Sequence, residues 1–324
     1  MIALIIRRIF QSLIVMLTVA LVAFILFRYV GDPVSQMVGQ ETSIADMERM
    51  RQELGLNDPV IVQFAHFAWN TLQGKFGISY RLGRPVNELF VERLPATLEL
   101  SLTAALFSLL VGIPMGVYTG LYPDRVLSKV FQAVSLIGIS LPTFLIGILL
   151  ILFFGVLLGW LPTFGRGEVV QFGWWSTGLL TTSGLKALIM PAFTLGMFQL
   201  TLIMRLVRSE MMEVLRTDYI KFARARGLTN RAVNFGHALK NTLVPVITIT
   251  GLQVGSIIAF AIITETVFQW PGMGLLFLES IRFVDIPVMG VYLVVIAFFF
   301  VLVNLIVDLL YVAIDPRLRI RDVQ

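Results

Sequence analysis

The chain has 324 residues, of which 57% are apolar and only 14% are charged, and its mean hydropathy is +0.87. A soluble domain is about half apolar and about a quarter charged, so this composition excludes a disordered chain and an ordinary cytosolic enzyme. Cysteine is absent, which excludes disulfides, thiolate metal sites and a cysteine nucleophile. The formal net charge is +5, and its meaning depends on where the basic residues lie.

Six apolar stretches are long enough to cross a lipid bilayer, which requires about 20 mostly apolar residues per helix. Helices buried in a large soluble protein keep a polar stripe, whereas residues 145–158 and 288–303 are apolar on all sides. We therefore predict an all-α, polytopic membrane protein. Its six transmembrane helices are expected at Ile9–Val30, Thr97–Gly120, Phe131–Leu158, Ala187–Val207, Leu243–Phe268 and Val288–Ile314.

The first stretch is better interpreted as a retained anchor than as a cleavable signal peptide. Arg7 and Arg8 precede it, as basic residues precede a signal sequence. Its apolar core is, however, longer than the roughly 7–15 residues of a signal peptide, and no small-residue cleavage site follows before Arg28.

The basic residues predict the orientation, because short cytoplasmic loops are enriched in lysine and arginine. The short loops on the opposite side hold only Arg166, Lys186 and Arg282. This distribution predicts cytoplasmic N- and C-termini. It also explains the positive net charge as a consequence of membrane topology, so we expect a lipid bilayer and no nucleic acid as partner. The basic residues assigned to the cytoplasm are Arg7, Arg8, Arg125, Lys129, those between Arg205 and Lys240, and Arg317, Arg319 and Arg321.

Three regions follow from this topology. Residues 1–96 comprise the anchor helix and a long extracytoplasmic segment, in which Glu41–Leu56 is expected to be helical, with a break at Gly55. Residues 97–314 form the main transmembrane domain, with a cytoplasmic loop at 208–242. Residues 315–324 form a short cytoplasmic tail.

The cytoplasmic loop predicts two helices joined by a bend. Thr217 or Asp218 can cap a short helix over Tyr219–Arg226, Gly227 suits the left-handed conformation that ends it, and Thr229 can cap the next helix. Exposure of Phe222 and Ile220 on such a helix would favour a docking surface. The alternative is an elbow that tucks its apolar residues under the spans and sets its arginines on lipid headgroups.

Sequence motifs for chemistry are missing. The chain has no phosphate-binding G-x-x-x-x-G-K-[ST] loop, no H-E-x-x-H and no G-x-S-x-G, so we predict no catalytic residue, metal or cofactor. Glu99, Glu265 and Asp308 lie near span ends, where a carboxylate can reach water or bond a helix end. A role in the pathway or in subunit packing is the alternative for each.

Four segments, in this order on six predicted spans, carry a family resemblance. They are Arg93–Leu100, Asp218–Leu228 with His237–Pro245, Glu265–Gly274, and Val303–Tyr311 with the Asp-Pro-Arg at 315–317. In these segments the chain resembles the permease subunits of bacterial ATP-binding-cassette (ABC) importers for dipeptides, oligopeptides and nickel, over essentially its whole length.

The resemblance implies the type I importer permease fold and half of a translocation pathway in the bacterial inner membrane. It implies a second homologous permease subunit, two ATP-binding subunits that hydrolyse ATP, and an extracytoplasmic substrate-binding protein. Peptides are the default cargo, while a nickel complex, glutathione or an opine-like solute remain open.

The resemblance also assigns roles to two groups of residues. Family members carry an E-A-A-x-x-x-G loop that docks into the ATPase; here Ala223 matches the second alanine and Gly227 the glycine, but Lys221 and Phe222 replace the glutamate and the first alanine. The ATPase-coupling residues are therefore Asp218, Tyr219, Ile220, Phe222, Ala223, Arg224, Ala225 and Gly227. A possible outer mouth or gate comprises Glu265, Trp270, Pro271 and Gly272, although an interfacial tryptophan on a tight turn would have the same sequence.

Two other function classes are alternatives to this one. A self-contained channel or secondary carrier would transport without ATP and would favour polar residues at mid-span, which are scarce here. An intramembrane enzyme requires paired catalytic side chains at one depth, and the sequence offers none.

Overall fold

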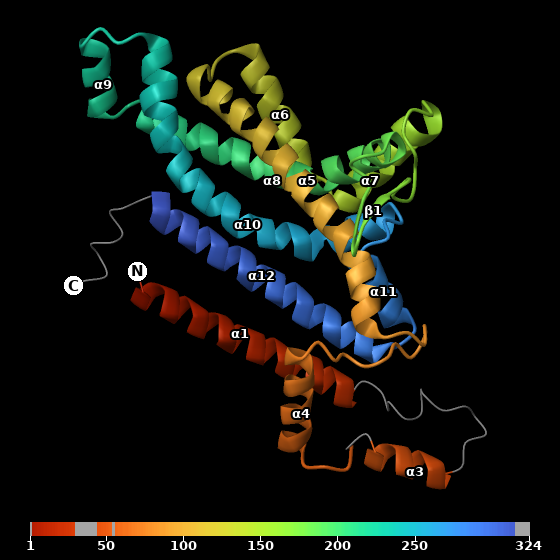
Figure 1. The fold of residues 1–324 in the computed structure, drawn as a ribbon. Coiled ribbons are helices and arrows are strands. Elements are labelled where there is room, and N and C mark those ends of the chain that lie inside the picture. Colours follow the sequence, from red (N-terminus) through yellow and green to blue (C-terminus); the bar gives the residue numbers. More distant parts are fainter. Residues whose placement is uncertain (1, 30–43, 54–55, 315–324) are drawn as a thin grey trace.

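The computed structural model describes residues 2–29, 44–53 and 56–314, and these are mostly helical (Figure 1). The elements are α1 (Ile2–Tyr29), α3 (Ile44–Glu53), α4 (Val60–Leu72), α5 (Val86–Leu121), α6 (Val126–Ser140), α7 (Thr143–Leu150), the π-helix η1 (Ile151–Leu157), β1 (Val170–Phe172), β2 (Trp175–Thr177), α8 (Thr182–Val214), α9 (Asp218–Ala225), the π-helix η2 (Ala232–Ala238), α10 (Leu239–Val267), α11 (Met273–Arg282) and α12 (Ile286–Ile314).

Four of the predicted spans are unbroken helices that are long and apolar enough to cross a membrane: α1, α5, α8 and α12. The other two are bent pairs. The chain from α6 to η1 bends by 111°, and the chain from η2 to the end of α10 bends by 54° between Gly251 and Gly255. Each bent pair counted as one span gives six, in the predicted order.

The third span was predicted as one helix over Phe131–Leu158, and this is wrong in detail. The helix ends at Ser140, Leu141 is extended with ψ 137°, and a new helix begins after Pro142. Proline explains the break, because it cannot donate the helical hydrogen bond and disfavours a helical conformation in the residue before it.

The core of the bundle is the pair formed by α5 and α8, the two longest helices at 36 and 33 residues. Three glycines one turn apart, Gly112, Gly116 and Gly120, lie against α8. A Cβ atom on Gly116 would lie 2.6 Å from the Cβ of Val207 and 2.7 Å from the carbonyl oxygen of Met204. Small residues therefore let the two backbones approach closely, as is common in membrane helix pairs.

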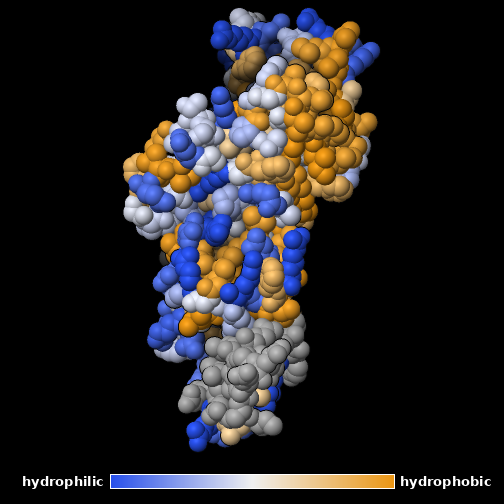
Figure 2. All heavy atoms as spheres, turned by 90° about the vertical axis from the view of Figure 1, so that its right-hand side faces the viewer, coloured by the Kyte–Doolittle hydropathy of each residue, from blue (hydrophilic) through white to orange (hydrophobic). Residues whose placement is uncertain are grey.

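The remaining elements lie around this pair. Helix α1 packs along α12 and is otherwise exposed, which agrees with a peripheral anchor (Figure 1). The fold is helical as predicted, except for one short antiparallel hairpin that the sequence did not predict, in which Gln171 of β1 pairs with Ser176 of β2. Figure 2 looks onto the end of the molecule that carries this hairpin and α11, where hydrophilic side chains lie beside broad hydrophobic areas.

Candidate coupling surface and outer polar network

The short helix and the bend after it are present, but the helix spans Asp218–Ala225 instead of the predicted Tyr219–Arg226, and neither Thr217 nor Asp218 caps it with its side chain. The helix begins at Asp218, whose carboxylate accepts a hydrogen bond from the Lys221 ammonium at 2.8 Å. Gly227 has φ +80°, the left-handed region that favours glycine, and its N–H donates to the Arg224 carbonyl at 2.9 Å. Thr229 accepts from the Ala232 N–H at 3.3 Å, so it caps the next helix. Thr217 precedes α9 but donates its hydroxyl to the Val214 carbonyl instead of capping.

The two faces of α9 differ. Ile220 and Ala223 are buried in a cluster with Val207, Met211 and Val233, and the predicted exposure of Ile220 is wrong. The reason is their spacing of three residues, which puts both on the face toward the spans. Phe222 is 64% exposed on the opposite face. The other exposed members of the predicted coupling group are Asp218, Tyr219, Arg224, Ala225 and Gly227.

Helix α9 is also tied to α10 by polar contacts. The Asn241 amide donates to the Tyr219 hydroxyl at 2.9 Å and to the His237 carbonyl at 3.1 Å. Together with the apolar cluster, these bonds connect α9 to α8, η2 and α10. A displacement of α9 would therefore carry the adjoining helix ends with it, as a packed body.

Next to α9, the last turns of α8 line a cavity of about 450 Å³. Three guanidinium groups make this end of the molecule basic. The lining residues are Arg205, Arg208, Ser209, Met212, Glu213 and Arg216.

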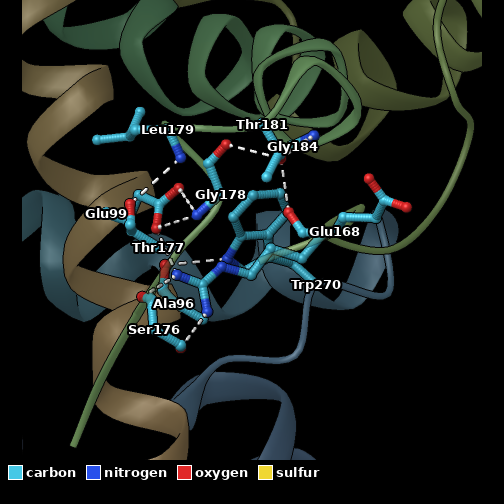
Figure 3. Close-up of polar contacts among 11 residues, drawn as sticks. Ala96, Glu99, Glu168, Ser176, Thr177, Gly178, Leu179, Thr181, Gly184 and Trp270 are labelled. Atoms are coloured by element: carbon cyan, nitrogen blue, oxygen red, sulfur yellow. Dashed lines mark hydrogen bonds and ion pairs between the residues drawn. The ribbon is translucent and has the colours of Figure 1, made fainter. Parts of the chain in front are cut away.

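A buried ion pair occupies the opposite end of the bundle. Glu99 of α5 pairs with Arg166, and both side chains are almost completely buried. The Arg166 guanidinium also donates to the Ser176 carbonyl at 2.7 Å. The Gly178 N–H donates to Glu99 at 3.1 Å (Figure 3). Glu99 is thus bonded inside the protein and does not reach water. The pair joins residues 67 positions apart, so local sequence patterns gave no signal for it.

Glu265 and Trp270 form a second buried cluster beside this pair. The Thr97 hydroxyl donates to Glu265 at 2.6 Å and accepts from the Met273 N–H at 2.8 Å, while the Leu275 N–H donates to Glu265 at 2.9 Å. The Trp270 indole donates to the Ala96 carbonyl at 2.9 Å (Figure 3).

This geometry bears on the residues predicted for an outer mouth. Trp270 is fully buried, which contradicts the alternative of an interfacial tryptophan. Gly272 has no space for a side chain beside the Glu265 carboxylate, and Pro271 is half-buried in the same turn. A role at the outer mouth stays a prediction. The Asp308 side chain lies outside the described residues.

A third polar cluster, which the sequence did not predict, fixes the segment before α5. The Ser79 hydroxyl donates to buried Asp285, which also accepts from the Tyr80 N–H at 3.1 Å. The Arg81 guanidinium lies 3.8 Å from the centre of the Phe283 ring and 3.1 Å from Glu279. These contacts connect the segment before α5 to the turn between α11 and α12.

Among residues 2–29, 44–53 and 56–314, no group of histidine and carboxylate side chains could hold a metal ion. The arrangement instead consists of an exposed short helix at one end of the spans and interlocked polar clusters at the other.

Comparison with known families decides the identity. The sequence profile described as the binding-protein-dependent transport system inner membrane component matches residues 112–320, and the profile of its N-terminal part matches residues 1–102. The chain belongs to this family. As a permease of this family it is the transmembrane subunit of an ABC importer, and ATP hydrolysis takes place in separate subunits.

Relatives match the permease over its full length. It is 38% identical over 321 residues to the oligopeptide transport system permease protein AppB of Bacillus subtilis, covering 98% of this chain and 100% of the relative. It is 35% identical over 332 residues to the dipeptide transport system permease protein DppB of Alkalihalophilus pseudofirmus, covering 98% and 100%. The self-contained carrier and the intramembrane enzyme are thereby set aside.

A solved structure supports the fold. The inward-facing MetNI methionine ABC transporter matches with a TM-score of 0.55 and 19% identity, covering 70% of the permease and 96% of the MetNI chain. The predicted type I importer fold is confirmed. Its family membership makes the permease a multi-pass inner-membrane protein that works with ATPase subunits and a binding protein.

Proposed function

We propose that the permease imports peptides as one half of a translocation pathway, and that a separate ATPase drives it through α9. The full-length match to permeases named for oligopeptide and dipeptide transport supports the peptide cargo. The observation that carries the coupling is the two-faced α9, with Phe222 exposed and Ile220 buried against the spans.

The complete importer, in this proposal, contains a second homologous permease, two ATP-binding subunits and one extracytoplasmic binding protein. Closure of the ATPase subunits on ATP moves the two α9 helices together. Because α9 is packed against α8 and α10, the motion tilts these spans as rigid bodies and opens the outer side while the inner side closes. Access from only one side at a time prevents an open pore.

We place both termini in the cytoplasm with α9. The first turn of α1 and the last turn of α12 lie toward the same end of the spans as α9, which supports this orientation (Figure 1). The arginine-lined cavity at the end of α8 supports it as well, because basic residues favour the cytoplasmic side. The clusters around Glu99, Glu265 and Asp285 then lie at the outer end.

We further propose that Glu265, Trp270, Pro271 and Gly272 hold the outer ends of α5 and α10 together at the mouth of the pathway. Thr97 bonds both Glu265 and the start of α11, so three elements meet at one hydroxyl group. A fully bonded buried cluster of this kind favours a single, fixed geometry.

Replacing Phe222 and Ile220 separately tests the coupling surface, since both lie on the same helix. We expect Phe222→Ala to weaken binding of the ATPase about tenfold while the melting temperature of the permease stays unchanged, because an exposed aromatic residue contributes to docking and not to the core. We expect Ile220→Ala to lower the unfolding free energy by about 2–5 kcal/mol, because it leaves a cavity. Co-purification of the ATPase and thermal unfolding measure the two effects.

A scan of single cysteines over residues 219–226 supplies the control. Cross-links to the ATPase are expected at exposed positions such as 222 and not at 220. Absence of cross-links at every position, or unchanged ATPase binding by Phe222→Ala, would count against docking at α9.

A further inference from the structure

Helix α4 of the extracytoplasmic segment stands apart from the bundle. It contacts α1 only near the end of that span, where the ring of Phe24 lies 5.5 Å from that of Phe64 and 5.9 Å from that of Phe67. The apolar span in α1 ends at Leu26, so α4 meets α1 at the edge of the hydrocarbon layer. From there α4 crosses α1 steeply and projects away from the bundle (Figure 1).

The sequence of α4 is amphipathic, although none of its residues is buried. The spacing of Ile61, Ala65, Trp69 and Leu72 puts these side chains on one face, which we call the apolar stripe. Ile61 is 83% exposed and Leu72 is 80% exposed. The polar residues Gln63, His66, Asn70 and Gln73 share a different face.

The contacts with α1 follow depth in the membrane. Phe24, inside the apolar span, meets the rings of Phe64 and Phe67, whereas Arg28, beyond the end of the span, donates to the Gln63 amide oxygen at 2.7 Å. The side of α4 that bears Gln63 is therefore the outer side. The apolar stripe, which lies away from that polar face, is turned toward the hydrocarbon.

The surface of α1 beside the apolar stripe also indicates that the stripe contacts lipid. The flank of α1 is exposed and apolar along the span, with Phe10, Leu17 and Leu21 among its exposed side chains, and a membrane protein presents such a flank to lipid. An amphipathic helix with tryptophan and leucine on one face, placed at the edge of that flank, has the properties of an interfacial helix.

We propose that α4 lies in the headgroup region of the outer leaflet, with Ile61, Ala65, Trp69 and Leu72 inserted among the lipid chains, so that it anchors the extracytoplasmic segment flat on the membrane. Phe24 and Arg28 fix its depth. This anchoring is independent of the cargo and of the ATPase contact.

The absence of native cysteine permits a direct test. We place single cysteines by Ile61→Cys and Leu72→Cys on the stripe and by His66→Cys and Asn70→Cys as controls on the polar face, and attach a nitrobenzoxadiazole fluorophore. The full chain is reconstituted in phosphatidylethanolamine–phosphatidylglycerol vesicles that contain lipids with a nitroxide on the acyl chain, at the depth proposed for the stripe. Quenching is measured for the chain alone and again after assembly with a partner permease, the ATPase subunits and a binding protein.

We expect nitroxide quenching at positions 61 and 72 to be at least about threefold stronger than at positions 66 and 70, as for an interfacial helix with one face in lipid. The difference is expected to persist after assembly. Equal quenching at all four positions would overturn the proposal. Loss of quenching at 61 and 72 on assembly would also overturn it, because the stripe would then be covered by protein.

Discussion

Replacing Gly227 with valine is expected to lower transport at least about tenfold while the permease still reaches the membrane. Gly227 has φ +80°, and a Cβ atom there would meet nothing within 4 Å, so the effect comes from the backbone alone. A left-handed conformation costs an L-residue about 1–2 kcal/mol, and more for a β-branched one. The chain relieves this strain by changing the angle between α9 and η2. A free-energy cost of about 1.4 kcal/mol for restoring the native angle corresponds to a tenfold loss of the transport-competent conformation. ATP-dependent uptake into vesicles measures the loss.

Two substitutions separate the bend from a general effect of a larger residue. Gly227→Asn is expected to retain most of the transport, because asparagine tolerates the left-handed region. Gly236 of η2 also has open space around its Cβ position but no positive φ, so Gly236→Val serves as the matched control. Normal transport by Gly227→Val, or an equal loss in Gly236→Val, would contradict this account of the bend.

Replacing Arg166 with methionine is expected to lower the unfolding free energy by about 3–5 kcal/mol. The substitution leaves the Glu99 carboxylate buried without its counter-charge, which is the costly way to break a buried ion pair. The hairpin would also lose the hydrogen bonds from the guanidinium to Ser176. Thermal unfolding of the purified permease in detergent micelles measures the change.

The double variant Glu99→Leu with Arg166→Met is expected to recover most of the loss, because it removes both buried charges. The control is Arg81→Met, which breaks the exposed ion pair with Glu279 and the contact with the Phe283 ring, and it is expected to cost only about 0.5–2 kcal/mol. If Arg166→Met cost no more than Arg81→Met, the buried pair would not be a stabilising feature.

The sequence was sufficient for the spans and for the bend at Gly227, because both depend on local properties. Apolar length predicts a membrane helix, and a glycine after a short capped helix predicts a left-handed residue. The break before Pro142 also had a local signal, since proline disfavours a continuous helix, although the mostly apolar character of residues 131–158 favoured a single span.

The rest depends on tertiary packing. Ile220 and Phe222 are both large and apolar, and only the position of α9 against α8 and η2 decides which of them is buried. The partners of Glu99 and Glu265 come from distant segments, 67 and 168 residues away in the case of Arg166 and Thr97. A charged residue near the end of a span therefore gave no indication that it would be buried and fully bonded.

The most direct test of the central claim is peptide uptake by reconstituted vesicles. The permease and its partner permease are inserted in vesicles, supplied with binding protein and labelled dipeptides or oligopeptides, and assayed with and without the ATPase subunits and ATP. We predict uptake only when the ATPase and ATP are both present. Uptake of peptide by the permease alone, without nucleotide, would contradict the account.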